Sequence, residues 1–307
     1  MIVDIPTPSE FRAAGLSQIH LAWKIVMQAV HDYNNAIYYK LTDEISKEST
    51  KEYWRRSQPM LTNSFILIQQ GIELALKGRI SLVSPFLLIG DPKEWPNRAA
   101  TESVSFGEFH SLDAASLVKI HNAVSTAHLD GAFSEFWMRV RTDRNKIMHS
   151  SAPGYFDPPR VVLTVLEAID SLFSEESWPQ RLLKFEHESK FAALGDTDDA
   201  LNIVMREISD ALSMLKPSEA LRFLKFDKDR RAYVCPHCYS QANRDWQDDW
   251  QHLAQFTEKK PAATNLLCIL CERTTEVERI SCDRDGCPGD VISEGICLTC
   301  TRSQGDT

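Results

Sequence analysis

The sequence predicts a mainly α-helical protein in which a helical bundle is followed by a small cysteine-rich module. Two observations lead to this fold class. Up to about residue 225, apolar residues recur three and four positions apart, as on one face of an α-helix, and alternating strand-like stretches are rare. All eight cysteines lie after residue 234. This change in composition predicts a bundle over 1–190, a helical extension or linker over 191–225 and the module over 226–307.

The helices are expected in an order set by capping residues and by proline. Thr7-Pro8-Ser9-Glu10 marks an early helix start. A loop rich in Pro and Gly is expected over 84–96, where a helix cannot continue. Pro158-Pro159 opens the fifth of the longer helices, and Lys216-Pro217-Ser218-Glu219 introduces the last. The expected helices cover 16–39, 60–83, 112–127 and 132–150, then the one from 158, and finally 176–188, 197–214 and 217–225.

Composition excludes several classes of protein. The chain has 307 residues, 43% of them hydrophobic, so it is long and apolar enough to bury a core. No apolar run approaches the roughly 18 residues of a membrane span, and the N-terminus shows no secretory signal, so we expect a cytoplasmic protein. The net charge of −9 favours an interaction protein over a broad nucleic-acid binder, which is usually basic.

The cysteines come in four closely spaced pairs. The pairs are Cys235/Cys238, Cys268/Cys271, Cys282/Cys287 and Cys297/Cys300. A reducing cytosol argues against disulfides, and four thiolates make a tetrahedral zinc site, so the spacing predicts two zinc ions. Spacing allows consecutive, crossed or nested matching of the pairs, and we favour the consecutive one. With four thiolates a site has no open position for water, so each zinc is expected to be structural.

The predicted helix over 132–150 ends in a basic, histidine-containing turn. Its apolar stripe, which runs from Phe133 through Val140 to Met148, includes Arg144. Asn145 and His149 stand one turn apart on an adjoining face. Arg139, Arg141, Arg144 and Lys146 make a local positive spot that suits a phosphate. The alternative is an arginine paired with a core carboxylate and a histidine that only terminates the helix.

Arg144-Asn145-Lys146-Ile147-Met148-His149, followed by small residues and a proline, resembles the R-N-x-x-x-H signature of the HEPN (higher eukaryotes and prokaryotes nucleotide-binding) superfamily. The segment Gly71-Ile72-Glu73-Leu74-Ala75-Leu76-Lys77 is similar to one often found in such bundles. The resemblance covers roughly residues 10–190. It implies an all-α bundle that forms a homodimer and brings two copies of the motif into one cleft, where RNA is cut without metal.

The resemblance also implies a role for each motif residue. His149 would be the general base or acid, Arg144 would neutralise charge on the phosphoryl oxygens, and Asn145 would orient the pair. Glu73 would either pair with Arg144 or occupy a surface or helix-cap position, while Arg141 and Lys146 would support phosphate binding. Products would carry a 2′,3′-cyclic phosphate. A tyrosine that some members carry two residues after the histidine is Ser151 here, so modification at that position is not expected.

The leading hypothesis is therefore an endoribonuclease of the toxin or phage-defence kind, with RNA as substrate and an antitoxin or defence-system protein as partner. The alternative is a non-catalytic dimeric interaction protein whose zinc module binds nucleic acid or protein. A zinc hydrolase is not expected, because the chain lacks the mixed histidine and carboxylate ligands of such a site. Nucleotide hydrolysis is not expected either, because the chain has no phosphate-cradling Gly-Lys-Ser/Thr loop. The acidic run from Asp245 to Asp249, with Trp246 and Trp250, is interpreted as a solvated helix face.

Overall fold

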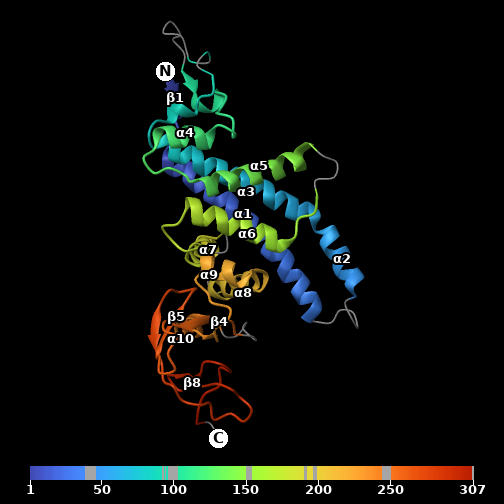
Figure 1. Cartoon of the computed structure of the whole chain (residues 1–307), viewed down its shortest axis with the longest axis vertical. Helices are drawn as coiled ribbons and strands as arrows, with labels where there is room; N and C mark the ends of the chain where they lie inside the picture. The colour runs from blue at the N-terminus through green and yellow to red at the C-terminus, as the bar shows by residue number, and fades with distance from the viewer. Residues whose placement is uncertain are drawn as a thin grey trace. The chain divides into compact units, whose positions relative to one another are not determined.

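The computed structural model confirms a mainly helical protein with a cysteine-rich C-terminal region (Figure 1). It describes residues 1–38, 46–91, 93, 95, 103–149, 154–189, 192–195, 199–243 and 250–305. The chain forms two compact units, Met1–Phe173 and Ser174–Thr307. In the described part of the chain, no helix has both the length and the apolar character needed to cross a membrane.

The first unit is a helical bundle in which α1, α3, α5 and α6 run side by side (Figure 1). In the described residues, a short parallel strand pair and the 3-10 helices η1 and η3 accompany the helices. The elements are β1 Ile2–Val3, α1 Pro8–Tyr38, α2 Lys47–Arg56, α3 Gln58–Ser81, η1 Pro85–Leu88, β2 Val104–Ser105, η3 Phe106–Glu108, α4 Leu117–Val124, α5 Gly131–His149 and α6 Pro158–Leu172. The bundle therefore joins helices that are far apart in the sequence.

The α1–α3 pair forms the centre of this bundle, and two glycines allow it to pack closely. A Cβ atom on Gly15 would lie 2.7 Å from the carbonyl oxygen of Gly71, and one on Gly71 would lie 2.7 Å from that of Gly15. A backbone carbonyl group cannot move aside as a flexible side chain can, so a larger residue at either position would force the helices apart. Each helix therefore needs glycine at the crossing. The side chains of these two helices that are at most 1% exposed include Ile19, Trp23, Leu61, Phe65, Ile68, Ile72 and Leu76.

Helices α2 and α4 were not predicted as the structure shows them, and α1 begins at Pro8, before the predicted range 16–39. Helix α2 was not expected. It buries none of its residues, so its sequence lacks the regular spacing of apolar residues that predicts a helix. It is held by Tyr53, whose hydroxyl donates to the Ala29 carbonyl at 2.7 Å, and by the Tyr33–Thr50 hydroxyl pair at 2.9 Å. Helix α4 is shorter than the predicted 112–127, because the Asp113 carboxylate instead accepts a turn hydrogen bond from the Ala115 amide.

His20 on α1 makes the stability of this unit depend on pH. Burial, and to a smaller extent the Lys24 charge, lowers the pKa of His20 to about 4. In the unfolded chain the pKa of a histidine is about 6.5. Between pH 6.5 and pH 4 the unfolded chain therefore binds the proton more tightly than the folded one. Stability should fall by about 3 kcal/mol as the pH drops from 6.5 to 4, and none of this contribution is lost above pH 6.5.

Urea unfolding at pH 7 and at pH 4.5 measures this dependence, with His20→Gln as the variant that cannot titrate. Carboxylates contribute equally to both proteins, so the variant should lose less stability than the wild type on acidification. An equal loss in both would show that His20 does not carry the effect.

The second unit combines helices with small sheets. Its elements are α7 Trp178–His187, η4 Ala192–Leu194, α8 Ala200–Met214, α9 Pro217–Leu224, β3 Tyr233–Val234, α10 Pro236–Gln241, β4 His252–Phe256, β5 Asn265–Cys268, β6 Thr274–Glu276, β7 Ile292–Ser293 and β8 Ile296–Cys297. Strands β3 to β6 form an antiparallel sheet in that order, and β7 and β8 form a hairpin.

Helices α7 to α9 belong to this unit, and α7 and α8 contact the cysteine-bearing part directly. Gln180 on α7 donates to the Leu270 carbonyl, and Asn202 on α8 donates to the Asn243 carbonyl at 2.8 Å. The ammonium group of Lys228 bonds to the last carbonyls of α8. The division between compact units thus falls at 173/174, whereas the sequence suggested segment bounds at 190 and 225.

Candidate functional site

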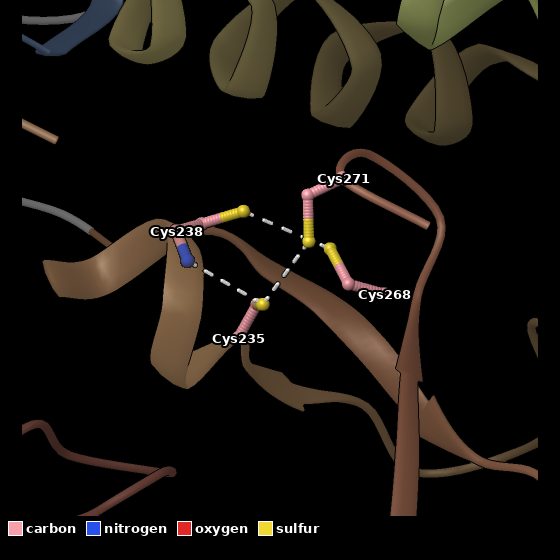
Figure 2. A group of neighbouring side chains, drawn as sticks. All are labelled: Cys235, Cys238, Cys268 and Cys271. Atoms are coloured by element: carbon pink, nitrogen blue, oxygen red, sulfur yellow. Dashed lines mark hydrogen bonds between the residues drawn. The ribbon is translucent and has the colours of Figure 1, made fainter. Parts of the chain in front are cut away.

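The first cysteine cluster brings together Cys235, Cys238, Cys268 and Cys271. Figure 2 shows the four side chains converging from α10 and its cap and from the end of β5 with the turn after it. The Cys235 and Cys271 sulfurs are 3.7 Å apart, and those of Cys238 and Cys268 are 3.9 Å apart. A tetrahedron with Zn–S bonds of about 2.3 Å has edges of about 3.8 Å. The four sulfurs therefore fit a tetrahedral ion of the size of zinc.

Backbone amides support the sulfurs of this cluster. The Cys238 amide donates to the Cys235 sulfur at 3.5 Å, and the Leu270 amide donates to that of Cys268 at 3.4 Å. Three of the four cysteines are buried, and Cys271 is half-buried. Hydrogen bonding with Cys235, together with burial, raises the pKa of Cys238 and Cys268. A bound cation would have to displace these protons, so low pH should favour its release.

The second cluster, formed by Cys282, Cys287, Cys297 and Cys300, is more open. Its sulfurs also lie within 4.8 Å of one another, and those of Cys282 and Cys300 are 3.8 Å apart. Only Cys297 is buried. The side-chain amide of Gln304 donates to the Cys282 sulfur at 3.5 Å. This cluster thus offers the same donor set as the first, at a more accessible place.

The two clusters show which pairs combine. The first pair joins the second and the third joins the fourth, so the structure shows the consecutive matching and excludes the crossed and nested ones. His237 contributes no atom to either cluster; its ring instead lies 3.4 Å from the Arg273 guanidinium. Two clusters of four cysteines, each able to hold a metal ion, are therefore present in the described chain.

Gly289 is a residue that the spacing of the cysteines does not reveal. A Cβ atom there would lie 2.4 Å from the Cys297 sulfur and 3.2 Å from that of Cys287. The Gly289 amide donates to the Cys287 sulfur at 3.3 Å, so the glycine backbone forms part of the wall of the second cluster.

Gly289→Ala should therefore disrupt the second cluster and leave the first intact. The expected result by elemental analysis is one metal ion per chain, where two are expected for the wild type. Gly286→Ala is a poor control because Gly286 has a positive φ; Ser303→Ala, outside the cysteine pairs, is the better one. Two retained ions in Gly289→Ala would contradict the close packing.

Helix α5 buries a different residue from the one predicted. Phe133, Phe136, Trp137 and Val140 are buried as expected, but the next buried side chain is Asp143. Arg144 is only half-buried, and Met148 is 52% exposed, so the predicted stripe through both is wrong for the last two turns. The reason is Arg160 on α6, whose guanidinium bonds to the Asp143 carboxylate and draws that side of α5 inward.

The basic residues of α5 differ in their partners. Arg139 contacts the Glu167 carboxylate at 2.5 Å, Arg141 lies 3.9 Å from that of Asp113, and Lys146 lies 3.9 Å from that of Asp143. Arg144 contacts the side-chain oxygen of Asn145 at 3.3 Å. Among the described residues, Arg144 is the basic side chain of this group that has no carboxylate partner.

Asn145 and His149 are both exposed, one turn apart on α5. Arg144 and His149 share no hydrogen bond within the described residues. Glu73 on α3 lies 2.8 Å from the Lys77 ammonium and accepts a hydrogen bond from Gln69 at 3.0 Å. The predicted pairing of Glu73 with Arg144 is thus not found in the described part of the chain.

Comparison with known proteins gives no family. No family model matches the chain, and no curated protein and no solved structure does so either.

Sequence reasoning missed Asp143 and Arg160, the pair that fixes the end of α5. Asp143 lies three residues after Val140 and seven after Phe136, so the helical spacing held a signal for its burial. Arg160 gave no such signal, because its partner is on another helix. The predicted acidic helix face over 245–249 and the position of Ser151 lie outside the described residues.

Proposed function

We propose that the protein is a metal-independent endoribonuclease of the HEPN type that acts in the cytoplasm as a toxin or phage-defence effector. The observation that carries this proposal is the half-buried Arg144, whose guanidinium contacts Asn145 while its three basic neighbours on α5 face carboxylates. A guanidinium without a carboxylate partner is suited to a phosphate. His149 follows in the last turn of the same helix and is exposed to a substrate.

The chemistry needs only these side chains and the RNA. Neutral His149 would take the proton of a ribose 2′-hydroxyl, whose oxygen then attacks the adjacent phosphorus. The bond to the 5′-oxygen breaks, and that oxygen receives a proton from an imidazolium. Arg144 would stabilise the charge that develops on the phosphoryl oxygens, with Asn145 holding its orientation. The products are a 2′,3′-cyclic phosphate and a 5′-hydroxyl.

A homodimer would supply the two histidines that these two proton transfers require. Met138 and Met148 on α5 are 59% and 52% exposed, and both lie toward the same side of the helix as Asn145. Exposed methionines beside polar residues suit a contact with a second copy. We propose that two α5 helices meet there, so that one cleft receives both copies of Arg144 and His149.

We propose that both cysteine clusters bind zinc and that the ions stabilise the second unit without taking part in catalysis. Four thiolates leave a tetrahedral ion no position for a water molecule. Cys271 lies in the turn that follows β5, and Cys238 lies on α10, so the first ion would join that sheet to the helix.

The second candidate, an interaction protein, is favoured by the distribution of charge. Residues 174–307 contain 17 Lys and Arg against 24 Asp and Glu, a net charge of −7, whereas 1–173 contain 17 against 19. Each zinc tetrathiolate would add a formal charge of about −2. Such a unit repels nucleic acid, so its partner would be a basic protein surface.

Incubation of the wild type with tRNA and single-stranded RNA in EDTA tests the proposal. We expect fragments that end in 2′,3′-cyclic phosphate and begin with a 5′-hydroxyl, detected by end-group analysis. Fragments with 3′-hydroxyl ends would contradict the proposed attack by the 2′-hydroxyl group. If the protein is dimeric and the RNA stays intact, the result would favour the second candidate, the interaction protein.

A further inference from the structure

The two cysteine clusters differ in how easily a small molecule can reach their sulfurs. In the second cluster Cys282, Cys287 and Cys300 are half-buried, and Cys297 is buried. The first cluster has the reverse proportion, with three buried members and the half-buried Cys271. Oxidation of a cysteine requires a thiolate that the oxidant can reach. A bound zinc ion keeps the sulfurs of both clusters as thiolates, so access is what distinguishes them.

The backbone that carries the second cluster is also less regular. Cys282 and Cys287 lie between β6 and β7, in a described segment, 279–291, that has no helix or strand. Cys300 lies in the turn after β8, a strand of two residues. In the first cluster, by contrast, Cys238 lies on α10, and Cys268 lies on β5, which pairs with a strand on each side. The second cluster can therefore bring two sulfurs together at a lower cost in broken hydrogen bonds.

Cys282 and Cys300 are the members of the second cluster that are best placed to form a disulfide. Both are half-buried, they come from different segments of the chain, and their sulfurs are 3.8 Å apart. A disulfide bond is about 2.05 Å long, so the sulfurs need to approach by less than about 2 Å. The side-chain amide of Gln304 donates to the Cys282 sulfur at 3.5 Å, and such a bond favours the thiolate.

We infer that Cys282 and Cys300 are a site of reversible oxidation, at which hydrogen peroxide forms a disulfide and causes the second cluster to release its metal ion. The inference rests on the proposed zinc binding and is independent of the proposed ribonuclease activity. A cytosolic disulfide of this kind is transient, because cellular thiols reduce it again.

The chemistry uses one molecule of peroxide. The Cys282 thiolate attacks one peroxide oxygen, the O–O bond breaks, and the products are a sulfenic acid on Cys282 and hydroxide. The Cys300 thiolate then attacks the Cys282 sulfur, the S–O bond breaks, and a second hydroxide leaves. The two sulfurs have lost two electrons, and two protons from solvent convert the hydroxides to water. Cys287 and Cys297 remain as thiolates, and two sulfurs are too few to hold a tetrahedral ion tightly.

Treatment of the zinc-loaded full chain with hydrogen peroxide, in the presence of a chromophoric zinc chelator, tests the inference. We expect release of one of two ions per chain, and mass spectrometry of proteolytic fragments should find Cys282 joined to Cys300. A thiol reductant with added zinc should restore the second ion, and without peroxide both ions should stay bound.

Three outcomes would overturn the inference. They are release of no ion, release of both ions at the same rate, and a disulfide between other cysteines. A wild-type chain that contains no zinc before treatment would instead overturn the proposed zinc binding on which the inference rests.

Cys282→Ser is the matched control, because it removes one sulfur of the oxidised pair and leaves the four cysteines of the first cluster in place. Peroxide should release no zinc from this variant and should form no disulfide at Cys300. Release of its remaining ion as fast as the wild type releases its first would show that the first cluster is the one oxidised, and would overturn the assignment to Cys282 and Cys300.

Discussion

His149→Ala is expected to abolish RNA cleavage while leaving the helical content and the metal content of the protein unchanged. A positioned general acid or base contributes about 10² to 10⁴-fold to a rate, and here one type of residue would perform both proton transfers. His149 is exposed at the end of α5, so its removal leaves no cavity and no unsatisfied buried group. The measurement is the initial rate of RNA cleavage in EDTA, with circular dichroism as the check on folding.

His128→Ala is the matched control for this prediction. His128 is also an exposed histidine of the first unit, but it lies in the segment between α4 and α5. Its loss should leave cleavage at the wild-type rate. Cleavage retained in His149→Ala would remove the proposed mechanism, whatever the behaviour of the control.

The arginines of α5 offer a second matched pair. Arg144→Ala should slow cleavage by about 10² to 10³-fold, the usual cost of one lost donor to a charged transition state. Arg139→Ala removes an equal charge from the same helix, but Arg139 contacts Glu167 and stacks over Phe136. It should therefore have a small effect. Similar losses in the two variants would indicate general electrostatic attraction of RNA rather than a specific role for Arg144.

Cys235→Ser is expected to cost one of two zinc ions and to unfold much of the second unit. Cys235 follows β3 and caps α10, and its partner Cys268 ends β5, so the first cluster joins the sheet to the helix. Structural zinc contributes about 10–16 kcal/mol in zinc-finger peptides near pH 7, which exceeds the stability of an ordinary domain. Elemental analysis and protection of residues 174–307 from proteolysis measure the two effects.

Cys282→Ser provides the contrast, because the second cluster is more exposed and connects only short elements near the C-terminus. This variant should also retain one zinc ion, but proteolysis should be confined to about the last 30 residues. Purified wild-type protein that contains no zinc would contradict the interpretation of both clusters. So would a Cys235→Ser variant that keeps two ions.

Several features could be predicted from the sequence because their causes are local. Helical spacing and capping residues identified α1, α3, α5 and α6 to within a few residues, except that α1 begins earlier, at the Thr7 to Glu10 capping sequence. The paired cysteines likewise indicated tetrahedral sites, because each pair is a local turn. The polar helix α2 was not predictable in this way, since its contacts with α1 are made by hydroxyl groups of Tyr33 and Tyr53.

The matching of the cysteine pairs depended on strand register. Ala254 on β4 pairs with Tyr233 on one side and with Cys268 on the other. This register brings the end of β5 level with the end of β3, where Cys235 begins the next turn. Spacing along the chain could not distinguish this arrangement from a nested one, because it contains no information about which strands are neighbours.

By itself, the sequence determined that the chain is mainly helical, that its candidate metal ligands are thiolates and that a basic turn containing histidine ends one helix. Only the tertiary structure decided which side of that turn is buried. Asp143 and Arg144 are neighbours, and either could face the core by helical spacing; the carboxylate does so because Arg160, on another helix, neutralises it. A charged group is buried where a partner compensates its lost hydration, and partners are brought together by the fold.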